Sequence, residues 1–158
     1  MDQRAKRFFT VPLIVVLSVV VLGSAHSATG ADNAAERAAL AVMERFLATF
    51  NASDVTGLAD TLAYPHVRFA SGGVRIFENR AAFIEATDMA AFASNFGWKY
   101  STWDDLEIIQ SGSDKVHIRV RFSRFDAEDQ LIASYDSLYV VVNQAGRWGI
   151  RARSSFAP

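Results

Sequence analysis

Three strand-like segments of this sequence carry histidine or arginine at every second position. The side chains are His66 and Arg68 in the first segment, His117, Arg119 and Arg121 in the second, and Arg151 and Arg153 in the third. Side chains two residues apart on a strand point to the same face of a sheet. Histidine, with a pKa of about 6.5, transfers protons at neutral pH, and arginine binds carboxylates through paired hydrogen bonds. Such a face could therefore bind an organic anion or move a proton on a bound substrate.

A second interpretation places the same residues on the solvated outer face of the sheet. The residues that alternate with them are apolar, such as Val67, Ile118 and Ile150, and would then form the core side of each strand. Composition alone favours this interpretation, because buried arginines need partners. We keep it for Arg119 and Arg121 and leave both interpretations open for the other segments, where a β-bulge would reverse the assignment locally.

The composition limits which other kinds of site are expected. The sequence contains no cysteine, which excludes a disulfide framework and a thiol nucleophile. His66 and His117 show no metal-ligand spacing, and His26 lies in the N-terminal segment, so we expect neither a metal nor another cofactor. The net charge of −1 gives no sign of a nucleic-acid partner.

The N-terminal residues are typical of a secretory signal peptide. A basic lead is followed by an apolar run from Val11 to Leu22 and then by small residues. The run is shorter than the roughly 20 residues that a membrane-spanning helix needs. We therefore expect residues 1–28 to be removed and residues 32–158 to form one periplasmic or secreted domain, with no stable membrane insertion after cleavage. The alternative is a membrane anchor formed by an uncleaved N-terminal segment.

The elements that would position the basic residues follow from the apolar periodicity. Helices are predicted over Asp32 to Phe50, after the capping residue Asp54 as far as Pro65, and over Arg80 to about Ala93, and a hairpin over His66 to Phe77. Four strands follow, over Trp98–Gln110, Lys115–Phe125, Leu131–Asn143 and Arg147–Phe156. Three helices that precede a long meander indicate an α+β fold, with the helices packed on a curved, mainly antiparallel sheet of about six strands.

This order of elements resembles the nuclear transport factor 2-like superfamily, which includes SnoaL-like proteins and the cone-shaped domain of ketosteroid isomerases. The segment MERFLATFNASDVTGLADTLAYPHVRF resembles the first two helices and first strand of the superfamily. FENRAAFIEA resembles the entry to its third helix, and NQAGRWGIRARSSF its final hairpin. The resemblance covers residues 34–156, and it implies the fold more strongly than a particular activity.

The departures from a ketosteroid isomerase concern its catalytic residues. The resemblance places Phe46 where such an isomerase has a hydrogen-bonding tyrosine, and Ala70 where it has its catalytic aspartate. A phenyl ring donates no hydrogen bond and a methyl group accepts no proton, so steroid isomerisation by that mechanism is excluded. The second oxyanion-hole acid of the isomerases falls on or near Asp136, if the last hairpin is two residues longer here.

The resemblance also implies which side chains face a cavity. If Ala70 stands at an inward position, His66 and Arg68 share its face. In the last strand the inward positions fall on Arg151 and Arg153. The resemblance thus implies a basic pocket for a small organic, anionic ligand, which Phe46 and Asp136 would also line.

Two hypotheses for function follow from this pocket. In the first, the protein is a cofactor-independent lyase, isomerase or cyclase, with His66 as general base and Asp136 as its partner. The three arginines of the first and last strands would then hold a carboxylate or stabilise an enolate. In the second, the domain is a non-catalytic periplasmic ligand-binding or accessory domain, because fold alone does not decide function. Under either hypothesis we expect a homodimer.

Overall fold

A computed structural model describes residues 28–70 and 72–158, and side chains from residue 34 onward except that of residue 71. The helices are α1 (Ala28–Asn51), α2 (Val55–Asp60), α3 (Arg80–Glu85) and α4 (Met89–Phe96). The strands are β1 (Leu62–Ala70), β2 (Gly73–Phe77), β3 (Tyr100–Ser111), β4 (Lys115–Phe125), β5 (Leu131–Gln144) and β6 (Arg147–Ser155). These elements confirm the predicted α+β class.

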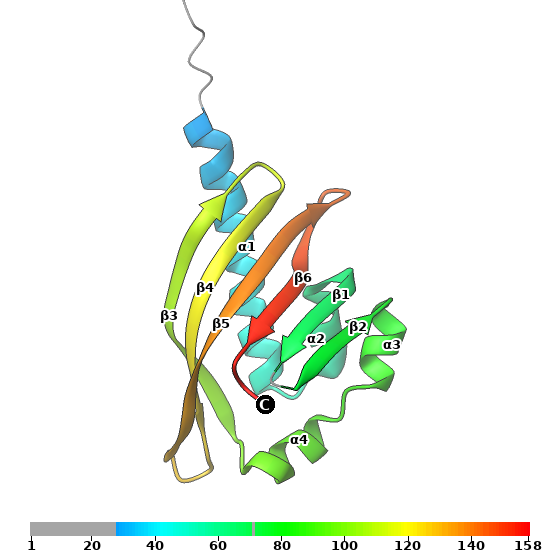
Figure 1. Cartoon of the computed structure of the whole chain (residues 1–158), viewed down its shortest axis with the longest axis vertical. Helices are drawn as coiled ribbons and strands as arrows, with labels where there is room; N and C mark the ends of the chain where they lie inside the picture. The colour runs from blue at the N-terminus through cyan, green and yellow to red at the C-terminus, as the bar shows by residue number, and fades with distance from the viewer. Residues whose placement is uncertain (1–27, 71) are drawn as a thin grey trace, which may run out of the picture.

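The six strands form one sheet in the order β2-β1-β6-β5-β4-β3. Strands β3 to β6 are an antiparallel meander, whereas β1 pairs in parallel with β6 and antiparallel with β2. The sheet curves, and α1 lies along one of its faces (Figure 1). The curved, mainly antiparallel sheet of six strands is therefore confirmed.

The hydrophobic core lies between α1 and the sheet. Residues spaced three and four apart on α1 are buried, as the 3.6-residue period of a helix requires. They form one cluster with alternate residues of β4. The members from α1 are Ala35, Ala39, Val42, Met43 and Phe46, and those from β4 are Val116, Ile118, Val120 and Phe122. Because one face of β4 is core, every second residue of that strand points toward α1.

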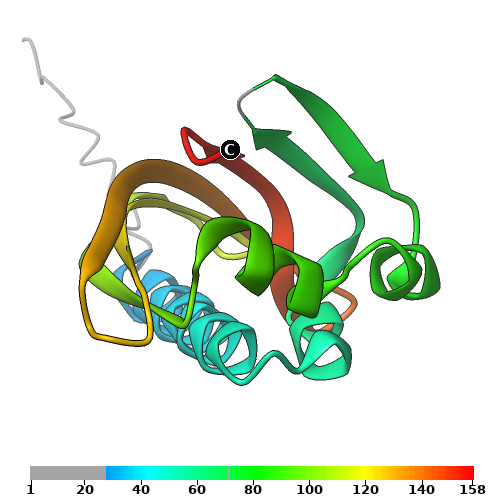
Figure 2. The ribbon, with the colours of Figure 1, turned by 90° about the horizontal axis from the view of Figure 1, so that it is seen from below.

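The third predicted helix is two helices in the structure. The apolar pattern from Arg80 to Ala93 continues across a break, where Asp88 begins α4 by accepting a hydrogen bond of 2.8 Å from the Ala91 amide. Aspartate is a preferred N-cap residue, so this residue type favours a new helix start. Seen from below in Figure 2, α4 lies across the end of the space between the sheet and α1.

The second predicted helix is shorter than expected, because α2 ends at Asp60 and strand β1 begins at Leu62, before the hairpin start predicted at His66. Leu62 is buried and pairs with Ile150 of β6, so the chain is already extended before the proline. Arg147 secures this start, because its guanidinium donates hydrogen bonds to the carbonyl oxygens of Asp60 and Leu62, at 3.0 and 2.8 Å.

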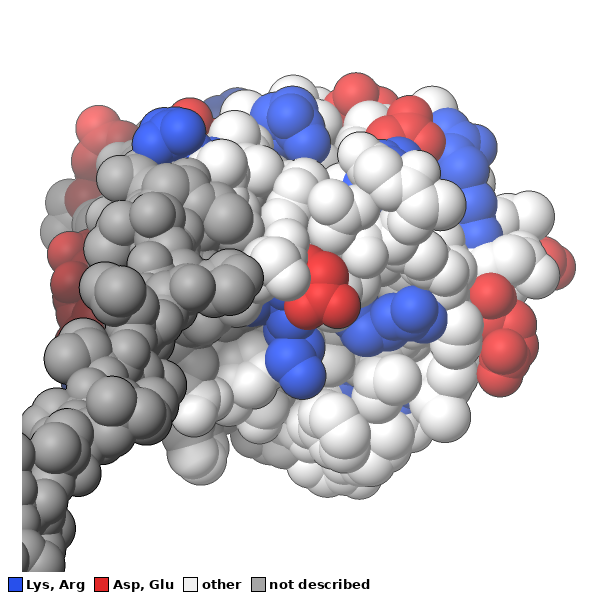
Figure 3. Space-filling model, turned by 90° about the horizontal axis from the view of Figure 1, so that it is seen from above, with Lys and Arg blue, Asp and Glu red and all other residues white. Residues whose placement is uncertain are grey.

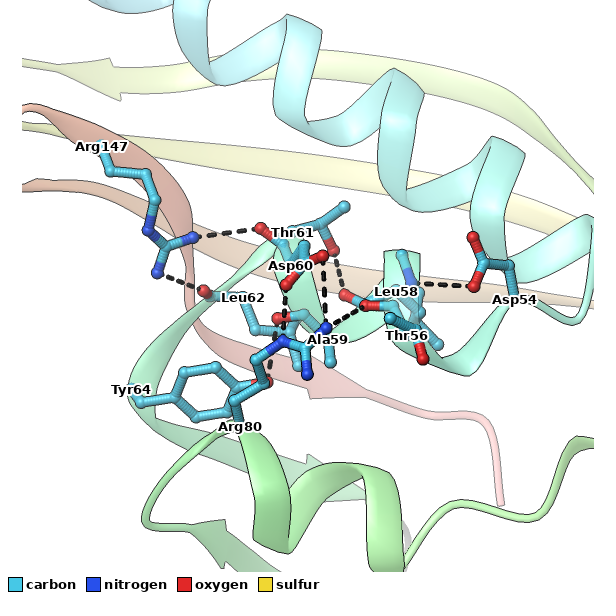
Figure 4. Close-up of polar contacts among 11 residues, drawn as sticks. Asp54, Thr56, Leu58, Ala59, Asp60, Thr61, Leu62, Tyr64, Arg80 and Arg147 are labelled. Carbon is cyan, nitrogen blue, oxygen red and sulfur yellow. Dashed lines mark hydrogen bonds and ion pairs between the residues drawn. The ribbon is translucent and has the colours of Figure 1, made fainter.

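The same junction ties α2 to its neighbours (Figure 4). The hydroxyl of Tyr64 donates to the Ala59 carbonyl oxygen at 2.9 Å, and Arg80 Nε of α3 lies 2.6 Å from Asp60 Oδ1. These contacts hold α2, α3 and the start of β1 in one arrangement, and β1 in turn positions His66.

No helix within the described ranges is long and apolar enough to cross a membrane. The predicted signal peptide lies almost wholly outside the described residues.

Candidate functional site

A cavity of about 170 Å³ lies between the sheet and helices α1, α3 and α4. Its aromatic and sulfur-containing walls are Phe46, Phe50, Phe77, Phe83, Met89 and Phe92. Its ionisable lining is His66, Arg68, Arg75, Asp88, Arg124, Tyr139 and Arg153. The cavity therefore combines apolar walls with a set of cationic side chains.

Three of the arginines form a row across adjacent strands. Arg68 of β1 pairs in register with Arg75 of β2 on one side and with Arg153 of β6 on the other. Arg153 pairs in turn with Tyr139 of β5, which continues the row. Like charges directly opposite one another destabilise a sheet. The row is therefore unfavourable unless something negative compensates it.

Hydrogen-bond donors in this lining lack acceptors. Buried without any partner are Arg68 Nε, Arg124 Nε, Arg124 Nη1, Arg153 Nε and the Tyr139 hydroxyl. Arg124 is only 2% exposed and Tyr139 0%. Native proteins satisfy nearly all buried polar groups, and each unsatisfied one costs about 1 to 3 kcal/mol. These donors mark a place where an acceptor is missing.

Aromatic rings surround Arg124. Its Cζ atom lies 5.0 Å from the ring centres of Phe92 and Tyr135, 5.5 Å from that of Phe96 and 5.7 Å from that of Phe122. Cation–π attraction of this kind offsets part of the cost of burial. The hydroxyl of Tyr135 also accepts a hydrogen bond from this guanidinium, but Arg124 Nε and Nη1 have no partner.

The buried charges shift the pKa values of the lining residues. Burial, reinforced by the charge of Arg153, lowers the pKa of Arg68 to about 10. The same two causes lower the pKa of Arg124. Burial raises the pKa of Tyr139, although the neighbouring arginines oppose this. At neutral pH Arg68 therefore remains charged and Tyr139 remains a neutral donor.

Among the described lining residues, Asp88 is the sole acid, and it is exposed and occupied as the cap of α4. The outer surface differs, because basic and acidic side chains lie next to one another on the face seen from above in Figure 3. The uncompensated positive charge is thus a property of the cavity rather than of that face of the molecule. The described residues contain no cluster of His, Cys, Asp and Glu that could hold a metal ion.

His66 is buried in the cavity wall in a defined tautomer. Its Nδ1 atom lies 2.9 Å from the carbonyl oxygen of Ile150, which can only accept, so Nδ1 carries the proton and Nε2 has the lone pair. The ring stacks on Phe77, with ring centres 6.1 Å apart, and meets the edge of Phe83. Burial, together with Arg153 and Arg68, lowers the pKa of His66 to about 4 despite the hydrogen bond to Ile150. His66 is therefore neutral at pH 7.

The structure brings four of the residues singled out in the sequence to this one cavity: His66, Arg68, Arg153 and Phe46. Ala70 is partly buried at the end of β1, where it pairs with Gly73, and is not part of the lining.

Arg151 lies outside the cavity because β6 contains a bulge. Val140 of β5 pairs with Ala152, but the next residue of β5 pairs with Ile150, which leaves Arg151 as an extra residue. A bulge changes the alternation of side chains, so Ile150 and Arg153 both reach the cavity. Arg151 instead donates from Nη1 to the carbonyl oxygen of Pro65 at 3.3 Å. The side-chain alternation predicted for this strand therefore does not hold at Arg151.

Asp136 is not close to His66. Its carboxylate is exposed and lies 3.4 Å from Arg121 Nη1, whereas Ser137 and Tyr139 on the same strand are buried toward the interior. The prediction for Asp136 assumed that the last hairpin is two residues longer than in the isomerases. Ser137 and Tyr139 are the inward side chains of this strand, so Asp136, next to Ser137, points to the outer face. The structure therefore forms no His66–Asp136 pair.

Arg124 and Tyr139 are site residues that the sequence did not predict. A signal for Arg124 was present, because it continues the inward alternation of Ile118, Val120 and Phe122 at the end of β4. No local pattern singles out Tyr139, and its unpaired hydroxyl becomes apparent only beside the arginines.

The assignment of Arg119 and Arg121 to the solvated face is confirmed. Their side chains are 61% and 53% exposed. Arg119 forms ion pairs with Asp105 and Glu107.

Solved structures show the same fold. A protein of unknown function with a cystatin-like fold from Nostoc punctiforme gives a TM-score of 0.64 at 16% identity, covering 78% of this chain and 90% of that chain. An NTF2-like protein of unknown function from Pseudomonas putida gives 0.62 at 17% identity, covering 80% and 88%. A ketosteroid isomerase-like protein from Erwinia carotovora atroseptica gives 0.55 at 17% identity, covering 77% and 96%. At these identities the likeness shows the fold alone.

No curated protein is significantly similar to the sequence. The model of one family, described as NTF2-like protein (DUF6841), matches residues 32–156. This match spans most of the chain and agrees with the curved sheet, the helices and the solved structures above. The chain therefore belongs to the NTF2-like family DUF6841, within the superfamily that its sequence resembled.

Proposed function

We propose that this domain binds a small organic anion in the arginine-lined cavity. The observation that carries the proposal is the set of buried donors without acceptors on Arg68, Arg124, Tyr139 and Arg153. Anionic oxygen atoms at this place would accept hydrogen bonds from these donors and offset the adjacent positive charges. Charge-assisted hydrogen bonds are stronger than neutral ones, so a bound anion would offset the cost of burying these unpaired donors and their positive charge.

The walls support a ligand with a flat apolar body. Phe46, Phe50, Phe83 and Phe92 line the cavity, and aromatic side chains favour stacked or edge-on contacts with a ring. A cavity of roughly 150 Å³ with apolar walls takes up benzene. The volume of about 170 Å³ here suits a single six-membered ring or an aliphatic group of similar size.

The test compares benzoate with benzamide, its neutral counterpart, by calorimetric titration and thermal unfolding. Benzoate is expected to bind and to raise the unfolding temperature, and benzamide is not. The variant Arg153→Met should lose the response, whereas Arg121→Met, on the outer face, should keep it. Equal binding of benzamide and benzoate would contradict the proposal.

A second candidate function is proton abstraction from the bound anion. Its basis is the Nδ1 hydrogen bond of His66 to Ile150, which leaves Nε2 unprotonated at pH 7 as a general base. The arginines would stabilise the enolate-like charge that develops. Incubation with phenylacetate in deuterium oxide tests this, because abstraction exchanges the hydrogens next to the carboxylate, as NMR detects. Absent exchange would leave a binding domain without chemistry, and exchange that persists in His66→Asn would exclude His66 as the base.

We further propose that a second copy of the chain covers the apolar outer face of β1 and β2. Phe69, Val74 and Ile76 are 46%, 59% and 57% exposed, and Phe69 pairs directly with Val74. Exposed apolar patches of this kind mark association surfaces. Sedimentation velocity should show a dimer that Phe69→Lys dissociates, whereas Ile109→Lys on β3 leaves it intact. A monomeric parent protein would contradict this.

Export through removal of residues 1–28 remains a proposal as well. Mass spectrometry of the protein from its native compartment would give the mature N-terminus. A mature chain that still contains the basic lead would contradict it.

A further inference from the structure

We infer that the ligand is an organic dianion with its two negative charges on separate groups, of which a dicarboxylate on a flat ring is the simplest case. This inference rests on the proposed function and specifies the class of ligand. Three properties of the lining lead to it: the number of unpaired donors, the net charge and the separation of the arginines.

The unpaired donors outnumber the acceptor sites of one carboxylate. Five buried atoms of the lining lack a partner, and they belong to Arg68, Arg124, Arg153 and Tyr139. A carboxylate offers two oxygens with about four lone-pair sites. It cannot accept from all five atoms with good geometry when they come from four side chains on different strands. A second acceptor group is needed to complete the set.

The charges lead to the same result. Three of the four lining arginines, Arg68, Arg124 and Arg153, are buried or partly buried, whereas Arg75 and the single acid of the lining, Asp88, are exposed, and His66 is neutral. A monoanion would leave most of this excess uncompensated inside a cavity of low dielectric, where residual charge is costly. A dianion compensates two of the arginines and leaves Asp88 to balance a third.

The arginines lie at two separate places, which favours two groups over one. Arg68 and Arg153 are adjacent on β1 and β6. Arg124 belongs to β4, which is separated from β6 by the whole of β5. Neighbouring strands are about 4.8 Å apart, so the backbones of β4 and β6 are about 10 Å apart.

The two guanidiniums share one aromatic neighbour, Phe122, whose ring centre lies 5.7 Å from Arg124 Cζ and 5.4 Å from Arg153 Cζ. Their other ring contacts differ, because Arg124 lies over Phe92 and Phe96 of α4, whereas Arg153 lies 5.4 Å from the ring centre of Tyr139. One negative group would bind beside Arg68 and Arg153, and the other beside Arg124. The aromatic walls would contact the ring between them.

The experiment is calorimetric titration at pH 8 with benzoate, the three benzene dicarboxylates and phenyl phosphate. The expected result is that at least one dicarboxylate binds about tenfold or more tightly than benzoate, because a second charge-assisted contact is formed. Arg124→Gln should reduce the affinity for that dicarboxylate by a larger factor than the affinity for benzoate. Arg121→Gln, on the outer face of the same strand, is the matched control, and Arg124→Lys tests whether charge alone suffices if the glutamine variant fails to fold.

The outcomes separate this inference from the proposed function. If benzoate binds and no dicarboxylate binds more tightly, the dianion is wrong and the anion site stands. If phenyl phosphate binds more tightly than every dicarboxylate, the two separate groups are wrong. If none of the anions binds, both the inference and the proposed function are overturned.

Discussion

Arg68 and Arg153 are paired across the parallel strands β1 and β6, and the Nε atom of each is buried without a hydrogen-bond partner. Two like charges at neighbouring positions repel each other, and burial strengthens the repulsion. A sheet that contains such a pair is less stable than it could be. The pair is therefore better explained by a ligand than by folding.

The substitution Arg153→Met should stabilise the unliganded protein. Replacement of a buried charged side chain by an apolar one of similar length is often neutral or favourable. We expect the free energy of unfolding to rise by about 1 kcal/mol, or the melting temperature by about 3 °C. Urea denaturation and calorimetry without ligand measure this. A large loss of stability would mean that Arg153 supports the fold, through its hydrogen bond to Ser155, rather than a ligand.

The stability of the protein should fall between pH 6.5 and pH 4 because of His66. Its pKa is about 4 in the folded protein, below the value of about 6.5 in the unfolded chain. In this window the unfolded chain binds the proton first, so acid favours unfolding. The loss from pH 7 to pH 4.5 is roughly 2 to 3 kcal/mol.

Urea denaturation of the parent protein and of His66→Asn at pH 7 and pH 4.5 isolates the contribution of His66 to the free energy of unfolding. The asparagine amide can replace the donor to the Ile150 carbonyl but does not titrate, so its pH dependence should be smaller. Identical pH dependence of the two proteins would show that His66 does not contribute. Acidic side chains titrate in both proteins and cancel in the comparison.

The substitution Asp88→Asn should strengthen anion binding without unfolding α4. Asparagine is as good an N-cap as aspartate, so the hydrogen bond from Ala91 is retained. Removal of the single acid from the described lining increases the net positive charge, and we expect affinity for benzoate to rise about threefold or more. Calorimetric titration at two salt concentrations measures it, and unchanged affinity would place the anion away from α4.

The substitution Gly149→Ala should disturb β1. A Cβ atom at Gly149 would lie 2.9 Å from the backbone nitrogen of Ala63, closer than real Cβ contacts allow. Overpacking against backbone costs about 2 kcal/mol. Gly73→Ala is the matched control, because no atom lies within 4 Å of its added methyl group. Equal stabilities of the two variants in urea would contradict this close approach.

Sequence periodicity was sufficient for the fold and for part of the site. The alternation of β1 put His66 and Arg68 on one face, and the family resemblance implied that this face lines a cavity. The alternation of β4 gives the same information for Arg124. Arg151 could not be placed, because the bulge in β6 depends on its pairing with β5. The break before Asp88 was hidden because apolar residues continue with helical spacing on both sides of it.

The sequence also could not show which buried donors lack a hydrogen-bond acceptor. Whether the Tyr139 hydroxyl finds a partner depends on side chains from four elements, and no local pattern encodes that. The position of Asp136 could not be predicted either, because a difference of one residue along β5 makes a candidate catalytic group an exposed partner of Arg121.

The break between α3 and α4 separates a helix that packs against the core from a helix that lines the cavity. The buried cluster between α1 and the sheet includes Phe83 of α3 but no residue of α4, so the eight residues of α4 serve mainly as one wall of the cavity. Met89 and Phe92 on this wall could thus diversify while the rest of the domain keeps its architecture. A relative with this fold could therefore bind a different ligand through substitutions in α4 alone and keep the arginines of the sheet.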